Sequence, residues 1–141
     1  MINIRHIGIV VKDYQKSLRF YQSLGFVEKC HRKEDPTFID AISAGQDIEL
    51  TTTRLVSPDG GMIELLDYGK HTEIKPNTLF SNGIAHFAIT VEDIDKLYLR
   101  LYRRLYNVDF VSPPKISPDG YAKVAFCQAP EGTFIELVEV L

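Results

Sequence analysis

The chain has 141 residues, of which 45% are hydrophobic and 25% charged, and its formal net charge at pH 7 is −3. This balance is typical of a folded globular protein and excludes extensive disorder; the length suits one domain or two small modules. The slightly acidic charge, without a basic run, argues against nucleic acid as the main partner. The apolar stretches are far shorter than the roughly 18 residues of a membrane span, so we expect no membrane segment.

The first part of the chain predicts a strand, a helix and three further strands. Residues 3–11 are apolar and β-branched, as in a strand buried on both faces. Asp13 is a suitable cap for a helix that runs to Leu24 and ends at Gly25. The strands that follow are expected at 26–33, 47–57 and 61–68.

The same order of elements returns after a polar linker at 69–82. A strand at 83–91 leads to Asp93, which is expected to cap a helix that runs to about Leu105. Shorter strands follow, the last two at 121–128 and 133–141. Both halves therefore indicate βαβββ, with module one at 1–68 and module two at 83–141 of a single domain.

A nine-residue frame occurs in both modules, at 58–66 and 130–138: Pro, an acid, Gly, two variable residues, Ile-Glu-Leu and an aliphatic residue. Each copy is preceded in its module by an apolar strand that holds one histidine. The two histidines are 80 residues apart and the two glutamates of the frame 72. Module one therefore has eight extra residues, which we place within 34–46, as one helical turn or as a loop.

These duplicated residues, His6 with Glu64 and His86 with Glu136, indicate a site for one divalent metal ion. A buried carboxylate costs several kcal/mol unless it is paired. Taken alone, each glutamate suits a salt bridge and each histidine suits a protein core, but their repetition in register favours a common function. Two carboxylates and two neutral imidazoles balance the charge of the ion and leave positions for water or substrate oxygens.

These residues resemble the vicinal oxygen chelate superfamily, which includes glyoxalase I, methylmalonyl-CoA epimerase and the extradiol dioxygenases. The resemblance covers nearly the whole chain and rests on 6–13, 86–93, Phe20-Tyr21 to Gly25-Phe26, and PxGxxIEL in both modules. It implies an α+β fold of paired βαβββ modules whose mixed sheets curl around a metal-binding cavity. The implied ligands of Ni²⁺, Zn²⁺, Co²⁺, Mn²⁺ or Mg²⁺ are His6, Glu64, His86 and Glu136.

Within the superfamily, this ligand set is similar to that of glyoxalase I. Extradiol dioxygenases need no ligand at the position of Glu64, so this residue points away from oxygen activation. The resemblance implies a lyase or isomerase of the lactoylglutathione lyase type, which transfers a proton next to a carbonyl through a metal-stabilised enediolate. It makes Glu136 the first choice for the base and Glu64 the second. Glu49 is an alternative, near where the epimerases place a base.

Two other functions stay open at this point. Epimerases usually have Gln where Glu64 stands, yet an acyl-CoA or sugar epimerase of the methylmalonyl-CoA epimerase type shares the mechanism. A metal-free module that binds a small molecule belongs to a different class. The expected substrate is a small carbonyl compound, possible forms being a glutathione hemithioacetal or a CoA thioester. Arg5, Arg54 and Lys123 could contact an anionic substrate, although charged strand residues are more often solvated.

The cellular setting and the assembly follow from simpler features. The N-terminus lacks the basic start and long apolar core of a signal peptide, so we expect a cytoplasmic protein. Cys30 and Cys127 lack CxxC spacing and are expected as buried or half-buried thiols. Exposed sheet edges predict a homodimer, whose sites take their ligands from one chain or from both.

Overall fold

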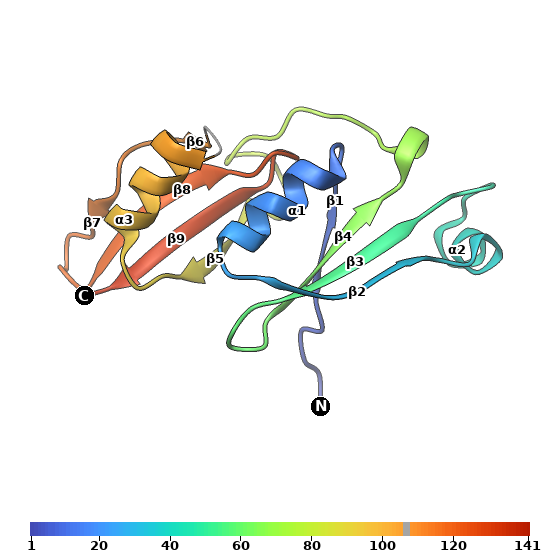
Figure 1. Cartoon of the computed structure of the whole chain (residues 1–141), viewed down its shortest axis with the longest axis horizontal. Helices are drawn as coiled ribbons and strands as arrows, with labels where there is room; N and C mark the ends of the chain where they lie inside the picture. Colours follow the sequence, from blue (N-terminus) through green and yellow to red (C-terminus); the bar gives the residue numbers. More distant parts are fainter. Residues whose placement is uncertain (106–107) are drawn as a thin grey trace. The chain divides into compact units, whose positions relative to one another are not determined.

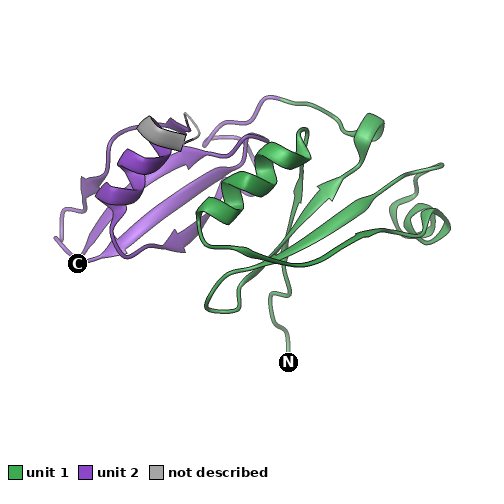
Figure 2. Cartoon of the chain, in the orientation of Figure 1, with its two compact units in different colours: residues 1–75 green, residues 76–141 purple. Residues whose placement is uncertain are grey.

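The computed structural model describes the backbone of residues 1–105 and 108–141 and the side chains of residues 1–102 and 108–141. It consists of two compact units, residues 1–75 and 76–141 (Figure 2). The boundary between them falls inside the linker expected at 69–82. Among the described residues, no helix combines the length and the apolar character that crossing a membrane requires.

Unit 1 is built on a mixed four-stranded sheet in the order β1-β4-β3-β2 (Figure 1). Strands β1 and β4 are parallel, whereas β4 with β3 and β3 with β2 are antiparallel. Its strands are β1 (Ile7–Val10), β2 (Val27–Lys33), β3 (Thr51–Val56) and β4 (Met62–Asp67). Its helices are α1 (Tyr14–Ser23), α2 (Pro36–Ser43) and the 3₁₀-helix η1 (Gly69–His71).

The helices of unit 1 begin and end where their sequences provide caps. The Asp13 side chain accepts a hydrogen bond from the Lys16 backbone N–H at 3.1 Å and caps α1. Gly25, at a φ of +99°, follows the helix in the left-handed conformation that glycine favours. Asp35 caps α2 in the same way, and Pro36 occupies its first turn. The extra residues of module one therefore form a helix of two turns rather than a loop.

Unit 2 has a five-stranded mixed sheet in the order β5-β9-β8-β6, with β7 also pairing with β8. Strands β5 and β9 are parallel, and β9 with β8 is antiparallel. Two short strands, β6 and β7, together occupy the place that β2 has in unit 1. The elements are β5 (His86–Thr90), α3 (Ile94–Leu99), the π-helix η2 (Arg100–Leu105), β6 (Asp109–Phe110), β7 (Lys115–Ile116), β8 (Ala122–Gln128) and β9 (Phe134–Val140).

In both units, strand alternation separates an inner face from the face that holds the glutamates. In unit 1, Leu55, Ile63 and Leu65 are at most 2% exposed, and β4 packs against α1. Ile135 and Leu137 have the same role in β9 of unit 2. Because successive residues of a strand point to opposite faces, Glu64 and Glu136 lie on the face away from these side chains.

The α+β class and the paired βαβββ modules with mixed sheets are confirmed. The curling of the sheets around a metal cavity stays a prediction, as does the single domain. The strand expected at 3–11 is shorter, and its burial on both faces is wrong: Ile9 is 5% exposed and Val10 43%. The reason is alternation, since Ile9 lies on the face of the core and Val10 on the opposite face.

Candidate functional site

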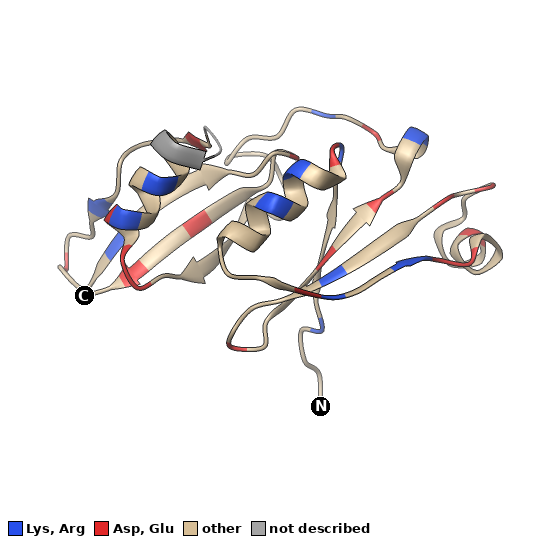
Figure 3. Cartoon of the chain, in the orientation of Figure 1, with Lys and Arg blue, Asp and Glu red and all other residues tan. Residues whose placement is uncertain are grey.

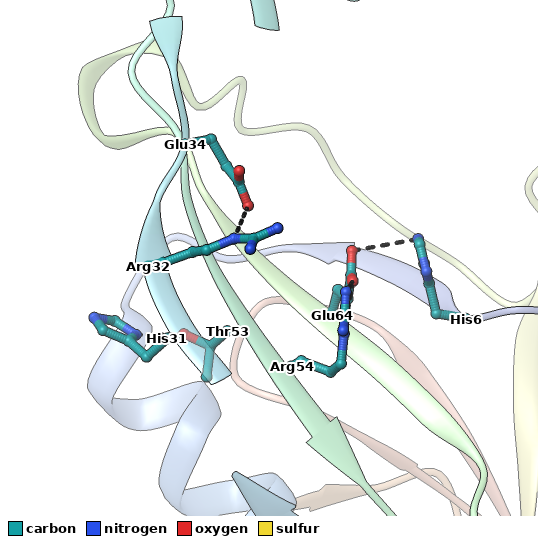
Figure 4. A network of polar contacts seen from close by, with 7 residues as sticks. All are labelled: His6, His31, Arg32, Glu34, Thr53, Arg54 and Glu64. Carbon is teal, nitrogen blue, oxygen red and sulfur yellow. Dashed lines mark hydrogen bonds and ion pairs between the residues drawn. The ribbon is translucent and has the colours of Figure 1, made fainter. Parts of the chain in front are cut away.

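In unit 1, parallel strands bring one histidine to one glutamate. The register pairs Gly8 of β1 with Glu64 of β4, and His6 lies two residues before Gly8. Nε2 of His6 is 3.3 Å from Oε2 of Glu64 (Figure 4). Glu64 is a buried charged residue, with 8% of its surface exposed. Such a carboxylate needs partners, and His6 is the first of them.

The second partner of Glu64 is Arg54, which stands directly opposite it on β3. The Arg54 guanidinium donates to Oε1 of Glu64 from Nε at 3.2 Å and from Nη2 at 2.9 Å (Figure 4). The two oxygens of one carboxylate thus have different neighbours, an imidazole at Oε2 and a guanidinium at Oε1. Charge-assisted hydrogen bonds of this kind fix the orientation of the carboxylate.

Unit 2 repeats the first of these contacts. The register pairs Ala88 of β5 with Glu136 of β9, and His86 again lies two residues earlier. Nε2 of His86 is 3.1 Å from Oε2 of Glu136. The residue opposite Glu136 on β8 is Phe126, whose ring meets the His86 ring edge-on with centroids 5.0 Å apart. An uncharged aromatic ring therefore stands where unit 1 has Arg54.

His86 also has an unsatisfied nitrogen. Its Nδ1 is buried and, within the described part of the chain, has no hydrogen-bond partner. With the proton on Nε2, the imidazole donates to the carboxylate and only Nδ1 is unsatisfied, at a cost of about 1–3 kcal/mol; with the proton on Nδ1, neither nitrogen is satisfied. Unsatisfied groups of this kind are uncommon in folded proteins and often lie at functional positions.

Each histidine–glutamate pair has the chemistry and spacing of two neighbouring metal ligands. With bonds of about 2.1 Å, adjacent donors of an octahedral shell lie about 3 Å apart. The observed 3.1 and 3.3 Å are close to this value and also suit a direct hydrogen bond between imidazole and carboxylate. Among the described residues, no three metal-ligating side chains form a group. Each unit thus contributes two of the four predicted ligands, and their meeting at one ion stays a prediction.

The remaining candidate residues, Glu49, Lys123 and Arg5, form no hydrogen bond or ion pair with either histidine–glutamate pair among the residues that the structure describes. Glu49 precedes β3, and its carboxylate is 3.9 Å from Nζ of Lys33, with 68% of its side chain exposed. Lys123 of β8 forms an ion pair with Asp95. Arg5 is exposed near the N-terminus. Glu49 therefore has the surroundings of a surface residue. Its contacts do not support a role as the base.

Arg32 shows a second arginine–glutamate pair on the same sheet as Arg54 (Figure 4). Its Nε donates to Oε1 of Glu34 at 3.1 Å. The hydrogen bond and the charge of Glu34 raise the pKa of the Arg32 guanidinium above its usual value. In contrast to Arg54, which pairs with a predicted metal ligand, Arg32 is held by a glutamate that belongs to no such pair.

Both cysteines have the predicted degree of burial. Cys30 is half-buried and Cys127 is buried, and both are free thiols. Burial raises the pKa of the Cys127 thiol to about 12. Cys127 therefore stays protonated in neutral solution and is unsuited to act as a nucleophile or a metal ligand.

A family model agrees with this pairing of modules. The model of the Glyoxalase/Bleomycin resistance protein/Dioxygenase superfamily matches residues 3–137. The chain belongs to this superfamily. No curated protein matches it. The superfamily assignment confirms the resemblance drawn from the duplicated His and Ile-Glu-Leu segments.

Solved structures with this fold include proteins of different activity. A glyoxalase family protein from Bacillus cereus is 19% identical, with a TM-score of 0.89, over 100% of this chain and 95% of that one. The trypanothione-dependent glyoxalase I of Leishmania major is 25% identical, with a TM-score of 0.69, over 99% and 87% of the two chains. A genomically encoded fosfomycin resistance protein from Listeria monocytogenes is 18% identical, with a TM-score of 0.71, over 100% and 96%. The likenesses below 25% identity show the fold alone.

The sequence reasoning missed how Arg54 and Phe126 relate to the glutamates. Each of them lies ten residues before its glutamate, across a hairpin in which residues 57–61 or 129–133 connect the strands. The duplicated frame contains this information. In a hairpin, the residue opposite each Ile-Glu-Leu glutamate lies as many residues before the middle of the turn as the glutamate lies after it.

Proposed function

We propose that this superfamily member is a metal-dependent enzyme that transfers a proton next to a carbonyl group, as a lactoylglutathione lyase does. One observation supports the proposal above the others: the same contact between histidine Nε2 and glutamate Oε2 occurs in both units at the same strand register. An isolated surface ion pair would have no reason to occur twice at equivalent positions.

The four side chains suit a divalent cation chemically. Imidazole nitrogen and carboxylate oxygen are ligands for Ni²⁺, Zn²⁺, Co²⁺ and Mn²⁺, and carboxylates also suit Mg²⁺. In the proposed site, His6 and Glu64 supply two donors and His86 and Glu136 two more, from one chain or from two chains of a homodimer. A bound ion would supply Lewis-acid polarisation of the substrate carbonyl, which acidifies the adjacent C–H.

The proton is assigned to Glu136. A carboxylate that takes a proton from carbon must turn toward the substrate, and the hydrogen bonds that hold it resist this movement. Arg54 holds Glu64 through two N–H donors, whereas the residue opposite Glu136 is the uncharged Phe126. The side chain of Glu136 is also the more exposed of the two, at 26% against 11%. These contacts favour Glu136 as the base and Glu64 as a fixed ligand.

A second candidate is an epimerase of the methylmalonyl-CoA epimerase type, which the surroundings of Glu64 favour. These enzymes usually have a neutral Gln at this position, and the ion pair with Arg54 offsets the charge of Glu64. Both reactions begin with the same abstraction of a proton next to a carbonyl. They differ in the substrate and in the position to which the proton returns.

Metal analysis tests the class, and isotope exchange tests the reaction. Protein purified without chelators should contain close to one divalent ion per complete site, and His86→Ala and His6→Ala should each lower that content. Wild-type protein in D₂O should then incorporate deuterium into methylglyoxal plus glutathione, or into methylmalonyl-CoA for the epimerase. If the protein binds none of the five ions, the proposal of a metal-dependent enzyme is wrong. The metal-free module that binds a small molecule is then the remaining hypothesis.

A further inference from the structure

The charge at the two histidine–glutamate pairs is unequal. With both imidazoles neutral, Glu136 leaves its pair with one negative charge. Glu64 and the Arg54 guanidinium cancel each other, since they form an ion pair at 2.9 Å. A divalent ion held by both pairs would therefore leave an excess of one positive charge. An uncompensated charge in a partly buried site is costly, so this site favours a negatively charged ligand.

Arg54 also keeps hydrogen-bonding capacity. A guanidinium has five N–H donors, and the contacts with Oε1 of Glu64 engage Nε and Nη2. The donors on Nη1 and the second N–H of Nη2 are left over from these two hydrogen bonds. The side chain is 30% exposed, so part of it is accessible to a ligand. A planar guanidinium with two neighbouring N–H groups that Glu64 does not engage matches the two oxygens of a carboxylate or a comparable oxyanion.

We propose that Arg54 binds an anionic group of the substrate, so that the site acts on carbonyl compounds with a carboxylate or similar oxyanion close to the reacting carbon. This inference rests on the proposed function, because it names the substrate class of the same site. Glu64 bridges Arg54 and His6: its Oε1 accepts from Arg54, and its Oε2 lies 3.3 Å from Nε2 of His6. An anion held by Arg54 is thus only a few ångströms from a predicted metal ligand.

The competing interpretation is an ion pair that merely neutralises a buried glutamate. Arg32 provides the comparison, because it lies on the same face of the sheet: Cys30 pairs with Arg54 in register, and Arg32 follows two residues later. Arg32 is 63% exposed and is held by Glu34. Replacing it removes the same charge from the same face and leaves the hydrogen bonds of Glu64 in place, since Arg32 interacts with Glu64 through charge alone. Arg32→Met is therefore the matched control for Arg54→Met.

The experiment uses two probes of the same skeleton, pyruvate and hydroxyacetone, in which a carboxylate replaces a neutral CH₂OH group. Full-length protein containing Co²⁺ is titrated with each probe by calorimetry, and the visible Co²⁺ spectrum is followed in parallel. Wild type and Arg32→Met should bind pyruvate at least about tenfold more tightly than hydroxyacetone, as expected for one charge-assisted pair. Arg54→Met should lose this preference, while its Co²⁺ content at saturating Co²⁺ equals that of wild type.

The outcomes separate the two proposals. If Co²⁺ binds and Arg54→Met keeps the preference for pyruvate, or wild type has none, the anion site is overturned and the metal-dependent function stands. If wild type binds no metal, the proposed function fails, and the same titration of metal-free protein decides the anion site by the same comparison. Arg54→Lys, which keeps the charge and loses the planar fork, should show an intermediate preference. It replaces Arg54→Met if circular dichroism shows that the latter does not fold.

Discussion

The two units place a histidine and a glutamate at matching positions of parallel strands but surround the glutamate differently. Gly8 or Ala88 stands opposite the glutamate on one side, and Arg54 or Phe126 on the other. The geometry of the pair therefore comes from backbone register, which the duplication preserves. Its charge comes from one side chain ten residues before the glutamate, which is free to differ. We propose that this single position gives the two glutamates their different roles, Glu64 as a fixed ligand and Glu136 as the base.

The largest expected effect separates the two glutamates by their role in proton transfer. Glu136→Gln should lower the rate of deuterium exchange at least about 100-fold, because it removes the proposed base. Glu64→Gln should lower that rate less, since Arg54 holds Glu64 in place as a ligand. The exchange is measured by NMR with whichever of methylglyoxal plus glutathione or methylmalonyl-CoA the wild type turns over.

The measurement is made at saturating metal, so that a loss of affinity does not imitate a loss of the base. Glu49→Gln is the control, because its carboxylate is exposed and pairs with Lys33. It should leave the exchange rate close to that of wild type. A larger loss in Glu64→Gln than in Glu136→Gln would reverse the assignment, and a large loss in Glu49→Gln would restore it as the base.

Exchanging Arg54 and Phe126 tests whether the residue opposite each glutamate makes the charges of the two histidine–glutamate pairs unequal. Arg54→Phe removes a positive charge beside Glu64 and should raise the affinity for Co²⁺ about tenfold. Phe126→Arg introduces that charge beside Glu136 and should lower the affinity by a similar factor. Phe126 is partly exposed, so an arginine at this position can reach solvent.

The affinity is measured by competition with a chromophoric chelator, after circular dichroism has shown that each variant is folded. The double variant Arg54→Phe with Phe126→Arg should return close to the wild-type affinity, because the charge of the site is restored. Equal affinities in both single variants would show that the charge opposite the glutamates has no part in metal binding.

Much of the fold could be predicted because its signals are local. Asp13 and Asp93 mark the helix starts, and the Pro-acid-Gly turns mark two hairpins, so the order βαβββ follows from short stretches of sequence. The two glutamates could be placed on the strand face away from the core by alternation. These features depend on a few neighbouring residues and not on distant contacts.

The rest depends on pairing between strands. The register of β3 with β4 puts Arg54 opposite Glu64, and Arg54 was expected to be solvated as most charged strand residues are. The strand predicted at 47–57 begins at Thr51, because residues 44–50 connect α2 to the sheet and Asp40 accepts hydrogen bonds from the backbone N–H groups of Asp47 and Ile48. No local pattern indicates the contacts of Asp40, and the residue opposite each glutamate is found only by counting back across the hairpin turn.

The helix caps offer a smaller test of the same comparison. Asp13→Ala should lower the free energy of unfolding by about 1 kcal/mol, since it removes the cap of α1. Asp93→Ala should have a smaller effect, because the Glu139 carboxylate accepts a hydrogen bond from the Ile94 N–H at 2.8 Å and remains at the start of α3. Urea unfolding measures both. Adding Glu139→Ala to Asp93→Ala should produce a larger loss than either change, and equal effects of Asp13→Ala and Asp93→Ala would contradict the role of Glu139.

The smallest effect concerns two turns of identical sequence, Ser-Pro-Asp-Gly, at 57–60 and 117–120. In each turn, the serine hydroxyl and then a backbone N–H donate to the aspartate and lower the pKa of Asp59 or Asp119. A lowered pKa in the folded state contributes stability above the unfolded pKa, and this contribution is lost as the pH falls through the folded value.

Asp59→Asn and Asp119→Asn should therefore each reduce stability slightly near pH 7, by less than the loss of a helix cap, and the difference from wild type should shrink as the pH falls through the folded pKa. Urea unfolding at pH 7 and at a series of acidic pH values measures the difference. Ser57→Ala should cost less in the Asp59→Asn background than in wild type, because the hydroxyl there donates to a neutral amide oxygen and not to a carboxylate. Both carboxylates are exposed and have the same donors, so the two turns should behave alike. A loss at one turn alone, or one that persists in acid, would show that contacts outside the repeated sequence determine the stability of the turns.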